Sequence, residues 1–309
     1  MTTSTNPPAA AWVEPPAQKW ENAHGPRPSR IALHLFLIAM SIVWLFPFGW
    51  AFYMALRPYS DIITSGNALS LPSRLSFDNF ATALTATNLP HFFINTLVIA
   101  IPAVILALFL ASMVAFAVTR FSFRFNVALL MMFTAGNLLP PQVIIVPLYR
   151  LYLLLPLPDF LNDKGVLYDS TIGIILINVV FQTGFCTFVL SNYMRTLPKE
   201  LTEAALVDGA SVWRIYSRVI MPLCRPALAA LATLEFTFIY NDFFWGLLLL
   251  SSGDKRPITA ALNNFQGSFF TDNSVLAAMS IMVAVPTVLV YIALQKQFIR
   301  GLALGSTKG

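Results

Sequence analysis

FFINTLVIAIPAVILALFLASMVAFAV, residues 92–118, is a run of 27 residues without a charged side chain. About 20 apolar residues in a helix cross the hydrocarbon core of a bilayer, so this run is long enough to span it. A helix is expected because lipid offers no hydrogen-bond partner to an unpaired backbone group. The stretch therefore predicts a transmembrane helix.

Other apolar runs of similar length raise the number of predicted spans to six. Charged residues make up only 11% of the chain, whereas soluble domains contain about 25%. The six predicted spans are residues 31–56, 92–118, 127–154, 170–193, 227–250 and 275–294. The third is expected to be the least continuous, because Pro140, Pro141 and Pro147 fall within it. The predicted fold class is an all-α integral membrane protein with six transmembrane helices.

The first 29 residues have a different composition from the rest of the chain. They are polar and contain six prolines, which is too little apolar surface to bury a core. We expect residues 1–29 to form a disordered tail and residues 30–309 to form the six-helix membrane domain.

The positions of the basic residues predict the orientation. When the six spans are threaded through a membrane, 13 of the 19 Lys and Arg residues fall on the side that holds both termini. Basic loops are retained in the cytoplasm, so both termini and the loop between the fourth and fifth spans are predicted to be cytoplasmic. The net charge of +5 then reflects membrane topology, and no nucleic-acid partner is expected.

The loop between the fourth and fifth spans carries a pattern of its own. Residues 198–208 predict a short helix, with Glu203 near the N-terminus, where the helix dipole favours acids. Gly209 suits the left-handed position after a helix, and Ser211 can cap a second helix. Pro222 marks the return to the membrane. The loop is expected to be a helix–turn–helix, either resting on lipid headgroups or docking on a cytoplasmic partner, and its acids favour docking.

The same loop resembles a known family. The pattern Glu203-Ala204-Ala205, then Gly209, then Val219-x-Met221-Pro222 is similar to the EAA loop of binding-protein-dependent ABC importer permeases. Members usually have isoleucine and leucine at positions 219 and 221. The resemblance implies that the loop docks into a groove on an ATPase subunit. The coupling residues that it implies are Glu203, Ala204, Ala205, Asp208, Gly209 and Pro222.

Further stretches resemble the carbohydrate-importing branch, and within it the shorter six-span subunit of the maltose-transporter type. These stretches include FDNFATAL (77–84), AFAVTRFSF (115–123), YNDFFWGLL (240–248) and QKQFIRGLALGSTKG (295–309). The resemblance covers about residues 30–309, with a core permease region at about 90–296. It implies a prokaryotic cell-membrane location and three partners: a second permease subunit, a dimer of ATPase subunits and an extracytoplasmic sugar-binding protein.

The phosphate-binding motif GxxxxGK[ST] is missing from the sequence. The chain is therefore expected to bind no cofactor, and ATP and Mg are expected on the ATPase partner. No catalytic or metal-ligating set is predicted either, since His24, His34 and His91 are scattered. Cys186 and Cys224 are interpreted as small packing residues.

Two acids in the predicted fifth span suggest a substrate pathway. A charge at the bilayer centre costs about 2.5–3.5 kcal/mol on insertion scales, so the presence of Glu235 and Asp242 in an apolar span requires an explanation. A carboxylate and an amide beside aromatic rings can bind the hydroxyls and C–H faces of a sugar, which makes Asn241 and Tyr240 further candidates. Alternatively, Asp242 lies near the outer interface and Glu235 pairs with a neighbouring helix.

The same two acids allow a second interpretation of the whole chain. Glu235 and Asp242 could form the proton relay of a proton-coupled secondary transporter. Such transporters are usually built from paired repeats, and no internal repeat is visible here. A permease of the same superfamily for amino acids, peptides or phosphate is a further alternative.

Overall fold

The computed structural model describes residues 28–58, 60–61, 72–122, 124–136, 140–263 and 272–306. The chain divides into two units, Met1–Gly49 and Trp50–Gly309. Residues 1–27 of the expected tail lie outside the described residues. Within the described ranges the regular elements are helices, and the one β contact is an isolated bridge between Pro156 and Val166. The all-α membrane class is confirmed.

The helix α1, Pro28–Ala55, begins in the first unit and corresponds to the first predicted span. Its apolar window has a mean hydropathy of 2.2, which suits a bilayer helix. Pro47 lies inside the helix without ending it.

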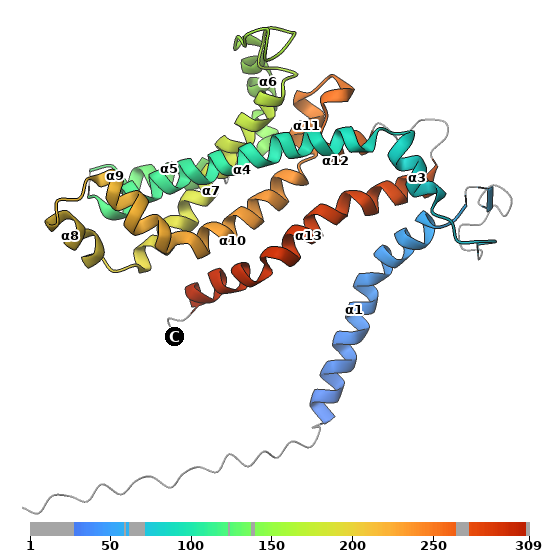
Figure 1. Ribbon diagram of the computed structural model, residues 1–309, viewed down its shortest axis with the longest axis horizontal. Helices are drawn as coiled ribbons and strands as arrows, with labels where there is room; N and C mark the ends of the chain where they lie inside the picture. The colour runs from blue at the N-terminus through green and yellow to red at the C-terminus, as the bar shows by residue number, and fades with distance from the viewer. Residues whose placement is uncertain are drawn as a thin grey trace, which may run out of the picture. The chain divides into compact units, whose positions relative to one another are not determined.

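The second unit is built around four long helices, α4 (Leu89–Arg120), α7 (Thr171–Thr196), α10 (Met221–Tyr240) and α13 (Asn273–Ser306). Helix α4 packs along α7, and α10 packs against α4, α7 and α13 (Figure 1). Each contains a stretch that is long and apolar enough to cross a membrane. They correspond to the second, fourth, fifth and sixth predicted spans.

The packing of α4 depends on small residues. Ala103, Ala107, Ala111 and Ala115 recur every four residues, and all four are fully buried. A spacing of four puts them on one face of the helix. Small side chains let two membrane helices approach closely, where dispersion contacts and not water exclusion drive the association.

The third predicted span is interrupted, as its prolines suggested. Helix α5 (Asn126–Gly136) is followed by a 3₁₀ turn, η1 (Pro141–Ile144), which leads into α6 (Ile145–Leu154). The two halves are inclined at 89° to each other. Pro140 is extended, with ψ of 125°, because the proline that follows it disfavours a helical conformation there.

The fifth predicted span, 227–250, had the wrong boundaries. Helix α10 begins earlier, because the second helix of the preceding loop continues into it, and it ends at Tyr240. Pro222 directly follows the π-helix Ile215–Ile220, and because proline has no N–H, the helical hydrogen bond that would continue the turn is missing at this position. A separate helix, α11 (Phe244–Leu249), follows, and the Asp242 carboxylate accepts a hydrogen bond from the Trp245 N–H in its first turn at 3.2 Å.

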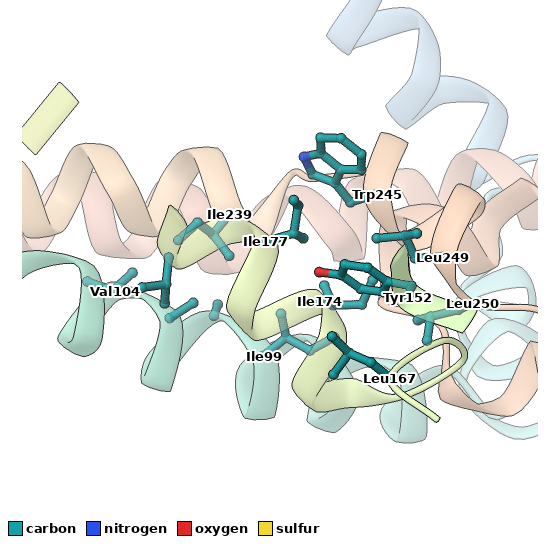
Figure 2. Packing of buried hydrophobic residues seen from close by; sticks show 13 residues of the cluster. Ile99, Val104, Tyr152, Leu167, Ile174, Ile177, Ile239, Trp245, Leu249 and Leu250 are labelled. Atoms are coloured by element: carbon teal, nitrogen blue, oxygen red, sulfur yellow. The ribbon is translucent and has the colours of Figure 1, made fainter. Parts of the chain in front are cut away.

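Three buried apolar clusters hold the second unit together. Figure 2 shows the first, in which Ile99 of α4, Ile177 of α7 and Trp245 of α11 belong to one cluster with Tyr152. A second cluster joins α4 and α7 to the loop before α10, and includes the free, buried Cys186 and Cys224. The third joins α4, α10 and α13 to two short helices, α3 (Asp78–Thr85) and α12 (Ile258–Leu262).

Hydrogen bonds group the loops by the side of the membrane that was predicted for them. At one end, Arg120 of α4 donates to the Met194 carbonyl of α7 at 2.8 Å, and the Tyr193 hydroxyl donates to the Leu223 carbonyl at 3.3 Å. At the other end, the Asn95 amide donates to the Arg256 carbonyl at 3.1 Å. Helices α4 and α7 therefore run parallel to each other, and α10 runs antiparallel to both, as the threading required.

Candidate coupling segment and translocation residues

Residues 200–222, called the coupling segment below, form a helix–turn–helix. Helix α8 (Glu200–Val207) ends at Gly209, whose φ of +71° is in the left-handed region. The Gly209 N–H donates to the Leu206 carbonyl and the Ala210 N–H to the Ala205 carbonyl, both at 3.0 Å. These two bonds close the helix as a Schellman motif and reverse the chain within two residues.

The second arm of the coupling segment runs without interruption into a membrane helix. Ser211 caps it by accepting a hydrogen bond from the Arg214 N–H at 3.4 Å, as predicted. A short helix α9 (Val212–Arg214) passes into a π-helix η2 (Ile215–Ile220), which continues directly as α10. Turns of π-helix are rare and often occur at functional sites.

Buried side chains of this second arm anchor the coupling segment to the membrane helices. Ile215 and Ile220 are fully buried in the second cluster, against residues of α4 and α7 that include Phe116 and Leu190. The Tyr216 ring meets the Phe116 ring edge-on at 5.4 Å between centroids, and its hydroxyl lies 2.7 Å from the Ser112 hydroxyl. These contacts join the segment to α4, and its second arm continues as α10.

The first arm presents an exposed surface. Glu203, Ala204, Asp208 and Gly209 are exposed, whereas Ala205 and Pro222 are half-buried. Beside them, Leu206 and Val207 are 48% and 88% exposed. Glu203 lies in the first turn of α8, where the helix dipole stabilises an acid. Exposed apolar side chains next to acids are suited to a protein partner with a basic, partly apolar groove.

Arg120 was missed by the sequence analysis. Its two terminal nitrogens donate to the carbonyls of Met194, Leu197 and Pro198, at 2.8 to 3.4 Å, where α7 ends and the chain turns toward α8. The last carbonyls of a helix have no partner within it, and a cation there also interacts favourably with the dipole. The sequence shows an Arg at the end of an apolar run, but not that it caps a different helix.

Glu235, a candidate for the substrate pathway, lies inside the helix bundle. It is fully buried, and one carboxylate oxygen accepts a hydrogen bond from the Cys186 thiol of α7 at 3.2 Å. The other oxygen, Oε2, has no hydrogen-bond partner among the described residues. Its carboxyl group therefore meets α7 within this chain.

The other three candidates occupy different surroundings around the end of α10. Tyr240 is fully buried and its hydroxyl donates to the Val283 carbonyl of α13 at 3.0 Å. Asp242 is half-buried and accepts from the Asn178 amide of α7 at 3.4 Å. Asn241 is exposed, and its amide donates only to its own helix, to the Thr237 carbonyl at 2.8 Å. Of the four side chains, Asn241 is the one that is open to a ligand.

A second feature that the sequence analysis missed is a network at the opposite end from the coupling segment. Asp169 is fully buried, with a φ of +58°, and it accepts hydrogen bonds from the N–H groups of Ser251 and Ser252 at 2.8 and 2.9 Å. The Lys164 ammonium lies 2.5 Å from its carboxylate. Burial alone would raise the pKa of Asp169, but the hydrogen bonds from Lys164 and Ser252 outweigh it and hold that pKa below its usual range.

The groups available for chemistry are few. Within the described part of the chain, no cluster of three or more His, Cys, Asp or Glu residues could hold a metal ion. The outstanding features are an exposed coupling segment at one end, a loop network at the other, and helices that connect them.

Several known proteins resemble this chain in sequence over most of its length. The family described as binding-protein-dependent transport system inner membrane component matches residues 103–303. A probable ABC transporter permease protein of Pyrococcus horikoshii is 33% identical, over 86% of this chain and 94% of its own. The diacetylchitobiose uptake system permease protein NgcG of Streptomyces coelicolor is 30% identical, over 88% of this chain and 87% of its own.

A solved structure has the same fold. It is a chain of a bacterial ABC transporter involved in the import of the acidic polysaccharide alginate, with a TM-score of 0.74. The match covers 89% of this chain and 98% of that chain, at 22% sequence identity.

Proposed function

Because the chain belongs to the family of binding-protein-dependent transport system inner membrane components, we propose that it imports a carbohydrate and receives the driving force through its coupling segment. The chain is a multi-pass permease subunit of an ABC importer, and it is not itself an enzyme. The observation that carries the proposal is the coupling segment itself. Its first arm is exposed, and its second arm is anchored to α4 and continues as α10.

The proposed substrate class is a sugar or a sugar derivative. The diacetylchitobiose permease that resembles this chain over most of its length supports that class. In this proposal Asn241 contacts the substrate with its exposed amide, and the neighbouring Phe243, which is 43% exposed, offers a flat apolar surface. Tyr240, Asp242 and Glu235 hold the end of α10 in position through α13 and α7.

The proposed assembly has four kinds of subunit. This chain pairs with a second, different permease subunit, and each provides half of the translocation pathway. Two ATPase subunits bind ATP and Mg on the cytoplasmic side, where both termini and the coupling segment of this chain also lie. An extracytoplasmic binding protein delivers the sugar at the opposite end, near the Asp169 network. The dependence on a binding protein is a property of the family.

The proposed coupling is mechanical. ATP binding closes the ATPase pair and displaces the groove that holds Glu203 and Asp208. Because the second arm continues as α10 and Tyr216 contacts α4, both helices move with the segment. Rigid-body movement of helices around a fixed site alternates access between the two sides of the membrane. Hydrolysis of ATP on the partner resets the assembly.

Nothing among the relatives above supports the proton-coupled alternative, since they are permeases of ABC transporters or of an uptake system of the same family. A direct experiment distinguishes ATP-driven import from proton-coupled transport. The purified transporter is reconstituted in liposomes with its binding protein, and uptake of labelled oligosaccharides is followed. We expect uptake that requires internal ATP and continues when an uncoupler collapses the proton gradient. Uptake without ATP that the uncoupler stops would contradict the proposal.

A further inference from the structure

A pocket of about 390 Å³ lies between the end of α4 and the coupling segment. Residues 118–122 and Asn126 line one side, and Lys199, Thr202 and Glu203 line the other. Unlike the apolar grooves elsewhere on the chain, its lining is rich in polar groups. The pocket adjoins the ends of two membrane-spanning helices, α4 at Arg120 and α7 at Thr196. The ends of membrane-spanning helices lie at the level of the lipid headgroups.

Three residues that line the pocket each have a buried polar atom without a hydrogen-bond partner within the described chain: Thr202 Oγ1, Arg120 Nε and Asn126 Oδ1. Thr202 is only 5% exposed, so its hydroxyl is buried without a bond. A buried polar group that lacks a partner costs free energy, and such groups in native proteins usually serve a purpose. Together they offer one cationic donor, one hydroxyl and one acceptor.

Two cationic residues, Arg120 and Lys199, line the pocket and outnumber its one acid, Glu203. Arg120 binds only neutral carbonyl groups, and no carboxylate of the described chain lies within ion-pair distance of Arg120 or Lys199. A guanidinium and an ammonium beside a free hydroxyl are the usual ligands of a phosphate group. Glu203 lines the same pocket, and its carboxylate opposes the binding of an anion there.

We propose that this pocket binds the phosphate group of an anionic phospholipid headgroup. The phosphate oxygens accept hydrogen bonds from Arg120 Nε, Thr202 Oγ1 and the Lys199 ammonium. Asn126 Oδ1 is an acceptor and accepts from a headgroup hydroxyl, which a glycerol headgroup provides and a choline headgroup does not. The bound lipid links α8 to α4, so it stiffens the connection between the coupling segment and the membrane helices. This inference concerns a lipid, and it holds whatever substrate the transporter carries.

The test is lipid binding to the purified, delipidated complex, measured by native mass spectrometry during titration with phosphatidylglycerol or phosphatidylcholine. Inorganic phosphate is titrated separately, because it has the same phosphate chemistry in soluble form. We expect a saturable phosphatidylglycerol site that phosphatidylcholine does not fill and that phosphate competes for weakly.

Variants locate the site. Lys199→Gln and Thr202→Val are each expected to weaken phosphatidylglycerol binding, by about tenfold and about threefold. Arg195→Gln and Thr196→Val are the matched controls, since both residues are exposed and lie outside the pocket lining. Glu203→Gln is expected to strengthen binding, because it removes the opposing charge.

Equal binding of the two lipids, or binding that Lys199→Gln and Thr202→Val leave unchanged, would overturn the proposal. Tight binding of inorganic phosphate without any preference for phosphatidylglycerol would contradict the proposal that the bound phosphate belongs to a lipid. Each variant is first checked for assembly with its partners, so that a lost lipid is not confused with a lost complex.

Discussion

The Tyr216 hydroxyl lies 2.7 Å from the Ser112 hydroxyl and joins the coupling segment to the C-terminal third of α4. Ser112 also donates to the Phe109 carbonyl of its own helix at 2.8 Å, so Ser112 keeps a partner without Tyr216. The contact connects an element that is expected to meet the ATPase with one of the long membrane helices.

Tyr216 offers a graded test of this link. Tyr216→Phe removes one hydrogen bond but keeps the ring on Phe116, and should lower stability by about 1 kcal/mol with transport largely retained. Tyr216→Ala removes the packing as well, at about 3–5 kcal/mol, and should release the coupling segment. Thermal unfolding of the complex and ATP-driven uptake measure the two effects. Equal uptake by Tyr216→Ala and the parent would show that the anchor is dispensable.

The residues that can replace Gly209 should be decided by whether they adopt its backbone conformation, and not by the size of their side chains. No atom lies within 4 Å of a side chain added at Gly209, so only its φ of +71° limits the choice. Asn tolerates this conformation, and Gly209→Asn should transport normally. Gly209→Pro cannot adopt it and also loses the N–H that binds the Leu206 carbonyl, so uptake should be abolished while membrane insertion persists. Normal uptake by Gly209→Pro would exclude the turn from coupling.

Asp169 predicts a pH-dependent part of the stability. Its pKa is lower in the folded chain than in the unfolded chain, so its contribution is complete above the unfolded pKa of about 3.9 and decreases as the pH falls through the folded value. Asp169→Asn retains the shape and tolerates the positive φ but loses the ion pair with Lys164. We expect it to be less stable by about 1–2 kcal/mol at pH 7.

Thermal unfolding between pH 3 and pH 7 checks this expectation. The difference between Asp169→Asn and the parent should begin to shrink below the unfolded pKa of about 3.9, because the unfolded chain then takes up a proton that the folded carboxylate does not. A difference that does not vary with pH would mean that the charge of Asp169 is unimportant.

Substitution of Asn241 tests contact with the substrate without changing how the helices pack. Because its amide is exposed and bonds only within its own helix, Asn241→Ala should raise the KM for sugar and leave assembly intact. Asp242→Asn is the structural counterpart, since it weakens acceptance from both Trp245 and Asn178 and should lower thermal stability. An unchanged KM for Asn241→Ala would remove this residue from the pathway.

The sequence was most informative where a local pattern determines local structure. Uncharged runs such as 92–118 predicted the membrane helices, and Gly209 with Ser211 predicted the turn and the second cap of the coupling segment. Helix boundaries were less certain where two elements fuse, as they do when η2 continues into α10. Helix α10 ends at Tyr240, and Asp242 accepts a hydrogen bond from the Trp245 N–H at the start of α11, whereas the apolar run predicted one span through residue 250.

Contacts between distant segments left no signal in the sequence. Arg120 binds carbonyls that lie 74 to 78 residues away, and Asp169 binds a loop 82 residues away. An Arg at the end of a helix can cap its own carbonyls, another helix or a lipid, and only the fold distinguishes them. Glu235 and Asp242 both bond to α7, yet the sequence did not show that Cys186 and Asn178 are their partners.

The central claim is that the exposed arm of the coupling segment holds an ATPase, and co-purification tests it most directly. The tagged chain is extracted in mild detergent, and its bound subunits are quantified for the parent, Glu203→Lys and Glu200→Lys. Both variants place the same charge in the first turn of α8. We expect Glu203→Lys to lose the ATPase and keep the second permease, whereas Glu200→Lys should retain both to a much greater extent. An ATPase bound equally by all three chains would contradict the central claim.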